Sequence, residues 1–267
     1  MNDPITDLDS GIGPGSGSGG VGGGAGGGGN GRTRIAAIGD LHVRDDNDGR
    51  YHALFAEISG EADVLVLAGD LTDLGKTSEA ELLAEDLRAC SIPALGVLGN
   101  HDYESGQPEK VVEILRQAGV TLLDEQASMV DGVGFAGVKG FVGGFGRGEL
   151  GAFGEQAIKT FVDESLNEAR KLENQLRTLR TERIMAILHY SPIAATVEGE
   201  PLEIFPFLGS SRLADAVDRF DGVKAVVHGH AHRGAFRGET PRGVPVYNVA
   251  QFVVQEAEGR PYALIDL

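Results

Sequence analysis

The chain alternates between short, largely apolar runs and longer segments in which apolar residues recur every three or four positions. An apolar run of four to eight residues is typical of a buried strand, whereas the longer spacing is typical of a helix that buries one face. The runs that predict strands are residues 34–38, 64–68, 94–98, 120–123, 133–138, 184–188 and 223–227. The segments that predict helices are residues 49–59, 78–89, 108–118, 155–181 and 211–220.

This alternation of strands and helices predicts an α/β fold with parallel strands. The intervals from Asp40 to Asp70 and from Asp70 to Asn100 are each 30 residues, about the length of a βαβ unit. In such units the residues that follow the strands gather at one edge of the sheet, so we expect these three side chains to converge. Residues 244–249 and 262–265 are further apolar segments, and they predict β pairing in a second sheet.

The first 31 residues differ in composition from the rest of the chain. Residues 11–31 contain 14 glycines, and such a segment has too little apolar surface to offset the entropy lost on ordering. Residues 1–31 therefore predict a disordered glycine-rich tail, and residues 32–267 predict one domain. A phosphate-binding glycine loop is excluded because no Gly-Lys-Ser/Thr sequence follows.

Charge and cysteine content narrow the function classes. A formal net charge of −17 disfavours a surface that coats nucleic acid, which is usually basic. The single Cys90 cannot form an internal disulfide, which favours a reducing compartment. No basic start precedes an apolar run, and no apolar stretch approaches 18 residues. We therefore expect a soluble, cytoplasmic protein that does not bind membranes.

Six of the seven histidines lie inside or beside short polar motifs, and only His52 lies in an expected helix. A structural, hydrogen-bonded role is the simplest interpretation of His52 and His228. For the other five, the accompanying carboxylates and the amide of Asn100 favour a site for Mn, Fe, Zn, Co or Ni, and the lack of thiolates argues against a structural zinc cluster.

The polar motifs follow a recognisable order: GDLH at 39–42, GDLTD at 69–73, GNHD at 99–102, His189, and GHAH at 229–232. Over residues 34–250 this order resembles the calcineurin-like metallophosphoesterases. The resemblance implies an α/β fold with a four-layer α/β/β/α sandwich, in which helices flank two mixed β-sheets. It also implies a cofactor of two divalent or mixed-valence transition metal ions, drawn from Mn, Fe, Zn or Ni.

Carried over residue by residue, the resemblance assigns one ion to Asp40, His42 and His232 and the other to Asn100, His189 and His230, with Asp70 as the bridge. It makes His101 the group that protonates the leaving oxygen or stabilises phosphoryl charge, and Asp102 the carboxylate that orients His101. Asp73 either orders the loop around Asp70 or only holds a turn.

Two loops are expected beside this site. Residues 139–154 contain seven glycines and predict a mobile loop, which is either a plain connection or a lid. In a lid, Arg147 would contact a phosphate and Phe141 the rest of the substrate. Residues 197–209 predict a second loop at the rim of the site.

The function that follows is hydrolysis of phosphodiester or phosphomonoester bonds of small substrates by a metal-activated hydroxide. A DNA or RNA nuclease and a metal-binding scaffold without catalysis are the alternatives. The sequence leaves the natural substrate, the identity of the metals and the oligomeric state open.

Overall fold

Two β-sheets lie at the centre of the computed structural model, which describes residues 31–46 and 49–267. The first sheet contains β1 (Arg34–Ile38), β2 (Val64–Ala68), β3 (Ala94–Val97), β4 (Val120–Leu122) and β11 (Ala263–Asp266), in the order β11-β1-β2-β3-β4. The second contains β5 (Ser128–Val130), β6 (Val133–Val138), β7 (Ile184–Leu188), β8 (Val223–His228), β9 (Arg237–Glu239) and β10 (Pro245–Asn248), in the order β5-β6-β7-β8-β10-β9. Antiparallel pairing occurs at the edge strands β11, β5 and β9, so both sheets are mixed.

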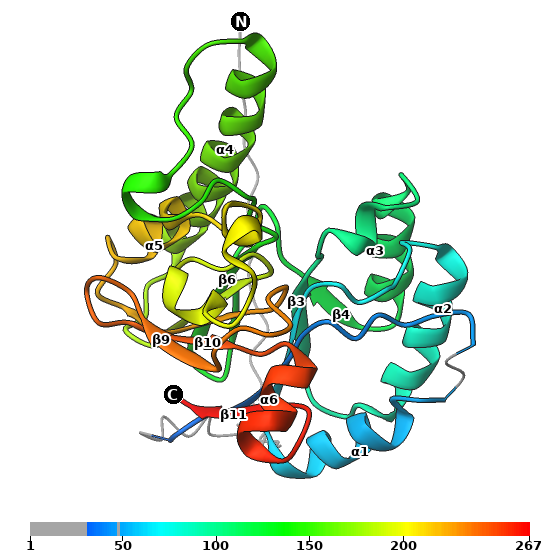
Figure 1. Ribbon diagram of the computed structural model, residues 1–267. Helices are drawn as coiled ribbons and strands as arrows, with labels where there is room; N and C mark the ends of the chain where they lie inside the picture. Colours follow the sequence, from blue (N-terminus) through cyan, green and yellow to red (C-terminus); the bar gives the residue numbers. More distant parts are fainter. Residues whose placement is uncertain (1–30, 47–48) are drawn as a thin grey trace, which may run out of the picture. The chain divides into compact units, whose positions relative to one another are not determined.

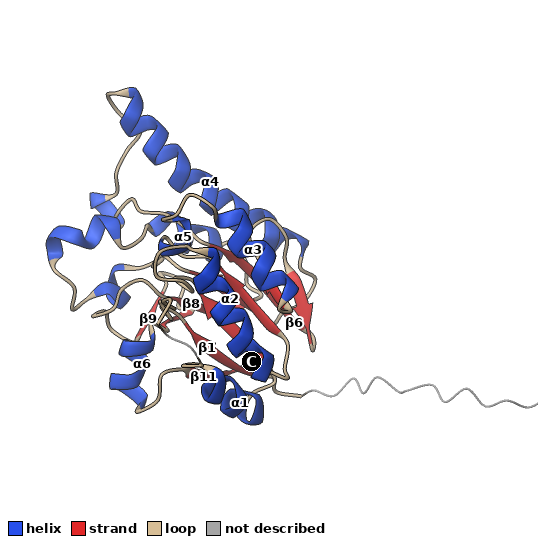
Figure 2. Cartoon of the chain, turned by 90° about the vertical axis from the view of Figure 1, so that its right-hand side faces the viewer, coloured by secondary structure: helices blue, strands red, loops and turns tan. Residues whose placement is uncertain are grey.

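Helices lie against these sheets (Figure 1, Figure 2). They are α1 (His52–Glu61), α2 (Thr77–Asp86), α3 (Pro108–Gln117), α4 (Gln156–Thr178), α5 (Ser211–Val217) and α6 (Gln251–Glu258). Short 3-10 helices are η1 (Leu87–Ala89), η2 (His101–Tyr103), η3 (Gly146–Gly148), η4 (Ala194–Val197) and η5 (Leu202–Phe207). No helix within these described ranges has both the length and the apolar character needed to cross a membrane.

The side chains of each strand alternate between two apolar clusters. In β1, Ile35 and Ala37 join the cluster between the two sheets, whereas Ala36 and Ile38 pack with α1, α2 and α3. The strand β7 divides its residues in the same way, between the intersheet cluster and a third cluster that contains residues of α4 and α5. The expected four-layer α/β/β/α sandwich is thereby confirmed.

The parallel strands place their carboxyl ends on one side of the sandwich. The strands β1, β2, β3 and β4 are parallel neighbours in the first sheet, and β6, β7, β8 and β10 are parallel neighbours in the second. Backbone hydrogen bonds link the two sheets at these ends, for example from Gly39 N to Val249 O over 2.8 Å. Residues that follow strands of different sheets can therefore reach one site.

The sheet assignment of residues 262–265 differs from the sequence prediction. Residues 263–265 of this segment belong to β11, which pairs antiparallel with β1 in the first sheet rather than with strands of the second. A short apolar segment indicates a strand but carries no information on which strand it pairs with. The pairing is supported by an ion pair between Arg34 and Asp266, whose Nε and Oδ1 atoms lie 3.1 Å apart.

Residues 139–154 also differ from expectation, because the first half of this segment is anchored rather than free. Gly143 N donates to Pro206 O and Gly144 N to Gly209 O, both over 2.9 Å, and the Phe145 ring packs on a cluster that includes Leu208. Gly144 has φ +87°, a left-handed conformation that glycine adopts without strain. The glycines here permit close backbone contact with residues 206–211. Residues 1–30 of the predicted glycine-rich tail lie outside the described residues.

Candidate metal centre

Each predicted ligand follows a parallel strand. Asp40 follows β1 after a single residue, Gly39, whereas Asp70 follows β2 and Asn100 follows β3. His189 follows β7, and the segment after β8 carries both His230 and His232. The convergence predicted from the strand pattern is therefore seen in the structure.

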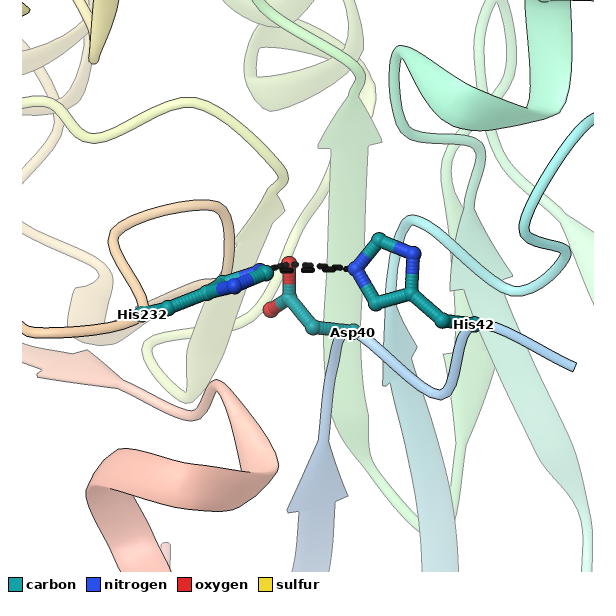
Figure 3. Close-up of side chains that lie close together, drawn as sticks. All are labelled: Asp40, His42 and His232. Carbon is teal, nitrogen blue, oxygen red and sulfur yellow. Dashed lines mark hydrogen bonds and ion pairs between the residues drawn. The ribbon is translucent and has the colours of Figure 1, made fainter.

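Asp40, His42 and His232 form the first group of potential ligands, with their ligand atoms all within 4.8 Å of one another. His232 Nε2 lies 3.0 Å from Asp40 Oδ1, and His42 Nε2 lies 4.0 Å from the same oxygen. Figure 3 shows the two imidazole rings approaching the carboxylate from opposite sides. Two nitrogens and one oxygen thus converge without any thiolate.

Asp70, His189 and His230 form a second such group. His189 Nε2 lies 3.3 Å from Asp70 Oδ1 and 2.9 Å from Asn100 Oδ1, so an amide oxygen joins this group. The other oxygen, Asp70 Oδ2, lies 3.8 Å from His42 Nε2. The two carboxylate oxygens of Asp70 therefore face different groups, as a bridging ligand would require.

The hydrogen bonds of the histidines fit a metal site. His189 Nδ1 donates to Ala68 O over 3.0 Å, which leaves Nε2 as the unprotonated nitrogen of the neutral ring. Within the described part of the chain, the buried His42 Nδ1 has no hydrogen-bond partner, although Asp73 Oδ1 lies 3.4 Å away. His230 Nε2 donates to Phe207 O over 3.2 Å, so a metal bound through that nitrogen would replace this bond.

Backbone strain is concentrated at the same residues. Asp40, His42, Asp70 and His230 have φ values of 58°, 45°, 47° and 69°. Among the described non-glycine residues, only Asp131 shares this left-handed conformation. It costs a non-glycine residue roughly 1–2 kcal/mol, and such cost is typically retained at functional sites.

Two motif glycines are required by contact with the carboxylates. A Cβ atom at Gly99 would collide with Asp70 Oδ1, and one at Gly229 would collide with Asp40 Oδ2. The first glycine of each of these two motifs therefore makes room for a carboxylate ligand from another motif.

The buried charges are strongly coupled. Burial raises the pKa of Asp70, but the adjacent His189 outweighs it and holds that pKa well below its usual range. Burial lowers the pKa of His189, and Asp70 overcomes this and raises it to about 9. Burial lowers the pKa of His230 to about 4. The ion pair between Asp70 and His189 thus favours the protonated imidazole when no metal is bound, whereas a bound metal would require the neutral ring.

The prediction that Asp102 orients His101 is wrong, because the two side chains bond to other groups. Asp102 accepts hydrogen bonds from Gly99 N, Thr72 N and Thr72 Oγ1 over 2.7, 2.8 and 2.6 Å, and also from Leu71 N. It joins the loops after β2 and β3, since a buried carboxylate needs donors from the main chain around it. Burial and then Asp70 raise its pKa to about 6.

Asp73 takes the place that was expected for Asp102. Its carbonyl oxygen accepts from His101 Nδ1 over 2.6 Å, which leaves the Nε2 of that ring for other contacts. His101 also lies near Asp70 and His42, and potential ligand atoms of these three residues fall within 4.8 Å of one another. Because the accepting atom is a main-chain carbonyl, the identity of residue 73 could not have revealed this contact.

Several supporting residues were not predicted. Gln251, at the start of α6, donates from Nε2 to Asp40 O over 2.6 Å. Asn248 donates from Nδ2 to Ala231 O over 2.7 Å and so braces the segment between His230 and His232. The only sequence signal for these roles was the placement of two amides, Asn248 inside the apolar run 244–249 and Gln251 just after it.

The two predicted substrate residues lie in different surroundings. Arg147 is exposed in η3. The Phe141 ring is partly buried and packs 5.1 Å from the Phe161 ring and 6.2 Å from the Tyr190 ring, measured between centroids. His228, which was interpreted as structural, is buried, with Nδ1 bonded to Gly229 O and Nε2 to Thr196 Oγ1.

An α/β/β/α sandwich that gathers carboxylates and histidines at the carboxyl ends of its strands defines a metallophosphoesterase-like protein. The family model for calcineurin-like phosphoesterases matches residues 33–234. The chain therefore belongs to the calcineurin-like phosphoesterase family and is a phosphoric ester hydrolase.

Two relatives support this class. A probable glycerophosphodiester phosphodiesterase from Arcobacter nitrofigilis is 23% identical over 213 residues, which cover 74% of this chain and 71% of the relative. A probable cyclic nucleotide phosphodiesterase from Synechococcus is 23% identical over 214 residues, which cover 76% of this chain and 75% of the relative.

Solved structures show the same fold. Phosphopantetheinyl hydrolase from Mycobacterium tuberculosis aligns with a TM-score of 0.61 at 14% identity, covering 87% of this chain and 95% of that one. A dimetal phosphatase from Danio rerio aligns with a TM-score of 0.54 at 14% identity, covering 87% of this chain and 91% of the phosphatase.

Proposed function

We propose that this chain hydrolyses phosphodiester or phosphomonoester bonds of small substrates with two bound transition metal ions. The observation that carries the proposal is the position of Asp70, whose two oxygens face His189 and His42 respectively. One ion would be held by Asp40, His42 and His232, and the other by Asn100, His189 and His230, with Asp70 between them. Mn, Fe, Zn and Ni suit this set of oxygen and nitrogen ligands.

When bound, such a pair of ions supplies a nucleophile at neutral pH and neutralises charge on the phosphoryl group. The main chain holds these ligands in place: Ala68 O accepts from His189 Nδ1, His101 N donates to Asp70 Oδ1, and His230 N donates to Asp40 Oδ1. Protonated His101 would offer its Nε2 hydrogen to the leaving oxygen, because Nδ1 is already bonded to Asp73 O. Asp102 would act through the loops, by holding Gly99 and Thr72 in position.

The substrate class is supported by the relatives, both of which are named as phosphodiesterases of small molecules. Exposed aromatic side chains border the proposed site. The Phe252 ring lies 5.9 Å from the His232 ring and is 54% exposed, and Phe207, whose carbonyl contacts His230, is 57% exposed. Such surfaces suit an ester with an apolar or aromatic alcohol.

Arg147 and Phe141 remain proposed substrate contacts. Exposure leaves the Arg147 guanidinium available to a phosphate, whereas the packing of Phe141 suits a ring that shapes the site from behind. Replacing Arg147 with Ala should raise KM for charged esters without changing metal content. The equivalent change at exposed Arg170 on α4 serves as the control, and equal kinetics for both variants would remove Arg147 from the substrate site.

The two alternatives predict different behaviour. A nuclease should bind DNA with strong salt dependence, which the net charge of −17 disfavours. A scaffold should bind metal without turnover. A cytoplasmic location is proposed on the single cysteine alone.

The experiment that tests the proposal is a hydrolysis screen of the metal-free protein reconstituted with Mn, Fe, Zn or Ni. Bis(p-nitrophenyl) phosphate, p-nitrophenyl phosphate, cyclic nucleotides and glycerophosphodiesters serve as substrates. We expect metal-dependent hydrolysis of at least one diester that is abolished by a chelator and restored by metal. Metal binding without hydrolysis of any ester would favour the scaffold.

A further inference from the structure

The ammonium group of Lys139, directly after β6, is enclosed by aromatic rings. Its Nζ lies 5.0 Å from the centroid of Phe141, 5.4 Å from that of Tyr190 and 5.5 Å from that of Tyr103. The same Nζ donates to Gly140 O over 2.8 Å. Within residues 31–46 and 49–267, no carboxylate lies within ion-pair distance of Lys139 Nζ, although the negative charges of Glu168 and Glu164 act on it from farther away. The π faces of the three rings are therefore the direct neighbours that stabilise this largely desolvated charge.

The rings of this aromatic cage lead to the metal centre. The Tyr190 ring lies 4.5 Å from the His230 ring and 5.4 Å from the His189 ring. Tyr103 belongs to η2, the short helix that begins at His101. Movement of the Tyr190 ring would therefore displace two of the potential ligands.

The main chain of Lys139 holds the same segment from the other side. Its carbonyl oxygen accepts hydrogen bonds from both His189 N and Tyr190 N, each over 3.0 Å. One residue thus fixes the backbone of the His189 segment through its carbonyl and the ring of Tyr190 through its side chain.

The other group of potential ligands has different neighbours. The His42 ring lies 4.5 Å from the His101 ring and 5.2 Å from the His232 ring, and His232 contacts Phe252. Loss of the Lys139 charge should therefore affect the two halves of the centre unequally.

We propose that Lys139 is a positioning residue for the half-site formed by Asn100, His189 and His230, and that it acts through the Tyr190 ring. The inference rests on the proposed binuclear centre. Supporting residues behind metal ligands typically change metal affinity by 10- to 100-fold, which sets the size of the effect.

Titration calorimetry of metal-free protein with Mn²⁺ tests the proposal. We call the ligands Asp40, His42 and His232 the first half-site and Asn100, His189 and His230 the second. In a His232→Ala background, which retains the second half-site, Lys139→Met should raise the Kd for Mn²⁺ by about 10-fold or more. In a His230→Ala background, which retains the first half-site, the same change should leave the Kd within about twofold. Lys139→Arg keeps a charge that can stack on aromatic rings and should restore most of the affinity.

Lys224→Met is the matched control, since Lys224 is an exposed lysine on β8, the strand that leads to His228. It should change neither Kd. Equal weakening of both half-sites by Lys139→Met, or no weakening of either, would overturn the proposal. If neither the wild type nor the two background variants bind Mn²⁺, the result would instead contradict the binuclear centre itself.

A second set of variants tests the route through Tyr190 without changing the buried charge. Tyr190→Phe keeps the ring and should bind Mn²⁺ like the wild type, whereas Tyr190→Leu should weaken the second half-site as Lys139→Met does. Adding Lys139→Met to Tyr190→Leu should cause no further loss, because both changes remove one interaction. Fully additive losses would show that Lys139 does not act through Tyr190.

Discussion

The Nδ1 nitrogen of His101 donates a hydrogen bond to the main-chain carbonyl of Asp73 over 2.6 Å. This contact fixes the ring and leaves Nε2 to carry the proton that a leaving group would take. We therefore predict that His101→Gln slows hydrolysis of esters with basic leaving groups by about 100-fold or more, and that esters of acidic phenols are affected less. Rates for a series of aryl and alkyl phosphodiesters provide the measurement.

Metal content is the control for that experiment. His101 also lies within ligand distance of Asp70 and His42, so a ligand role predicts that the His101→Gln variant loses metal. Full metal content with an equal loss for all leaving groups would contradict the general-acid role and indicate a charge contact to the phosphoryl oxygens.

Asp102 should matter more for stability than its position in the GNHD motif suggests. Asp102→Ala leaves the buried donors of Gly99, Thr72 and Leu71 without their acceptor, so the free energy of unfolding should fall by about 3 kcal/mol or more. Chemical denaturation measures this change. Asp163→Ala, at an exposed position on α4, is the control and should stay within about 0.5 kcal/mol of the wild type. An equally small change at Asp102 would contradict its bridging of the two loops.

Metal affinity should rise with pH. In the metal-free protein Asp70 raises the pKa of His189 from 6.5 to about 9, so this ring is protonated at neutral pH and must lose its proton to bind a metal. Between pH 7 and the pKa of about 9, the apparent Kd of the second half-site should fall by about 10-fold per pH unit, and it should level off above that value. Titrations in the His232→Ala background, with buffers that do not chelate metal, measure this dependence. A Kd that is constant from pH 7 to 9 would contradict the prediction.

The sequence predicted the parts of this fold that depend on local pattern. The apolar runs at 34–38, 64–68, 133–138 and 184–188 coincide with β1, β2, β6 and β7, because the buried positions of these strands hold only apolar residues and glycine. The pattern did not predict α6, whose sequence QFVVQEAE has too few apolar residues for a clear helical face. Nor did it predict β5 and β9, since three-residue edge strands are too short to show a period.

The sequence predicted the parts of the site that are formed by side chains of distinctive chemistry. It did not predict the contacts that are made by main-chain groups. The types and order of the residues from Asp40 to His232 predicted the convergence that the structure shows. The partner of His101 was missed because a carbonyl group has no signature in the sequence. The anchoring of residues 143–146 was missed because glycine serves both mobile loops and close backbone contacts.

The central claim is that two metal ions share Asp70 and that hydrolysis depends on both. The most direct measurement is the number of Mn²⁺ ions bound, together with the rate of bis(p-nitrophenyl) phosphate hydrolysis, for the wild type, Asp70→Asn and His42→Ala. We predict two ions and full activity for the wild type, weakened binding of both ions for Asp70→Asn, and mainly one weakened ion for His42→Ala. Two ions bound by Asp70→Asn at wild-type affinity would contradict the claim.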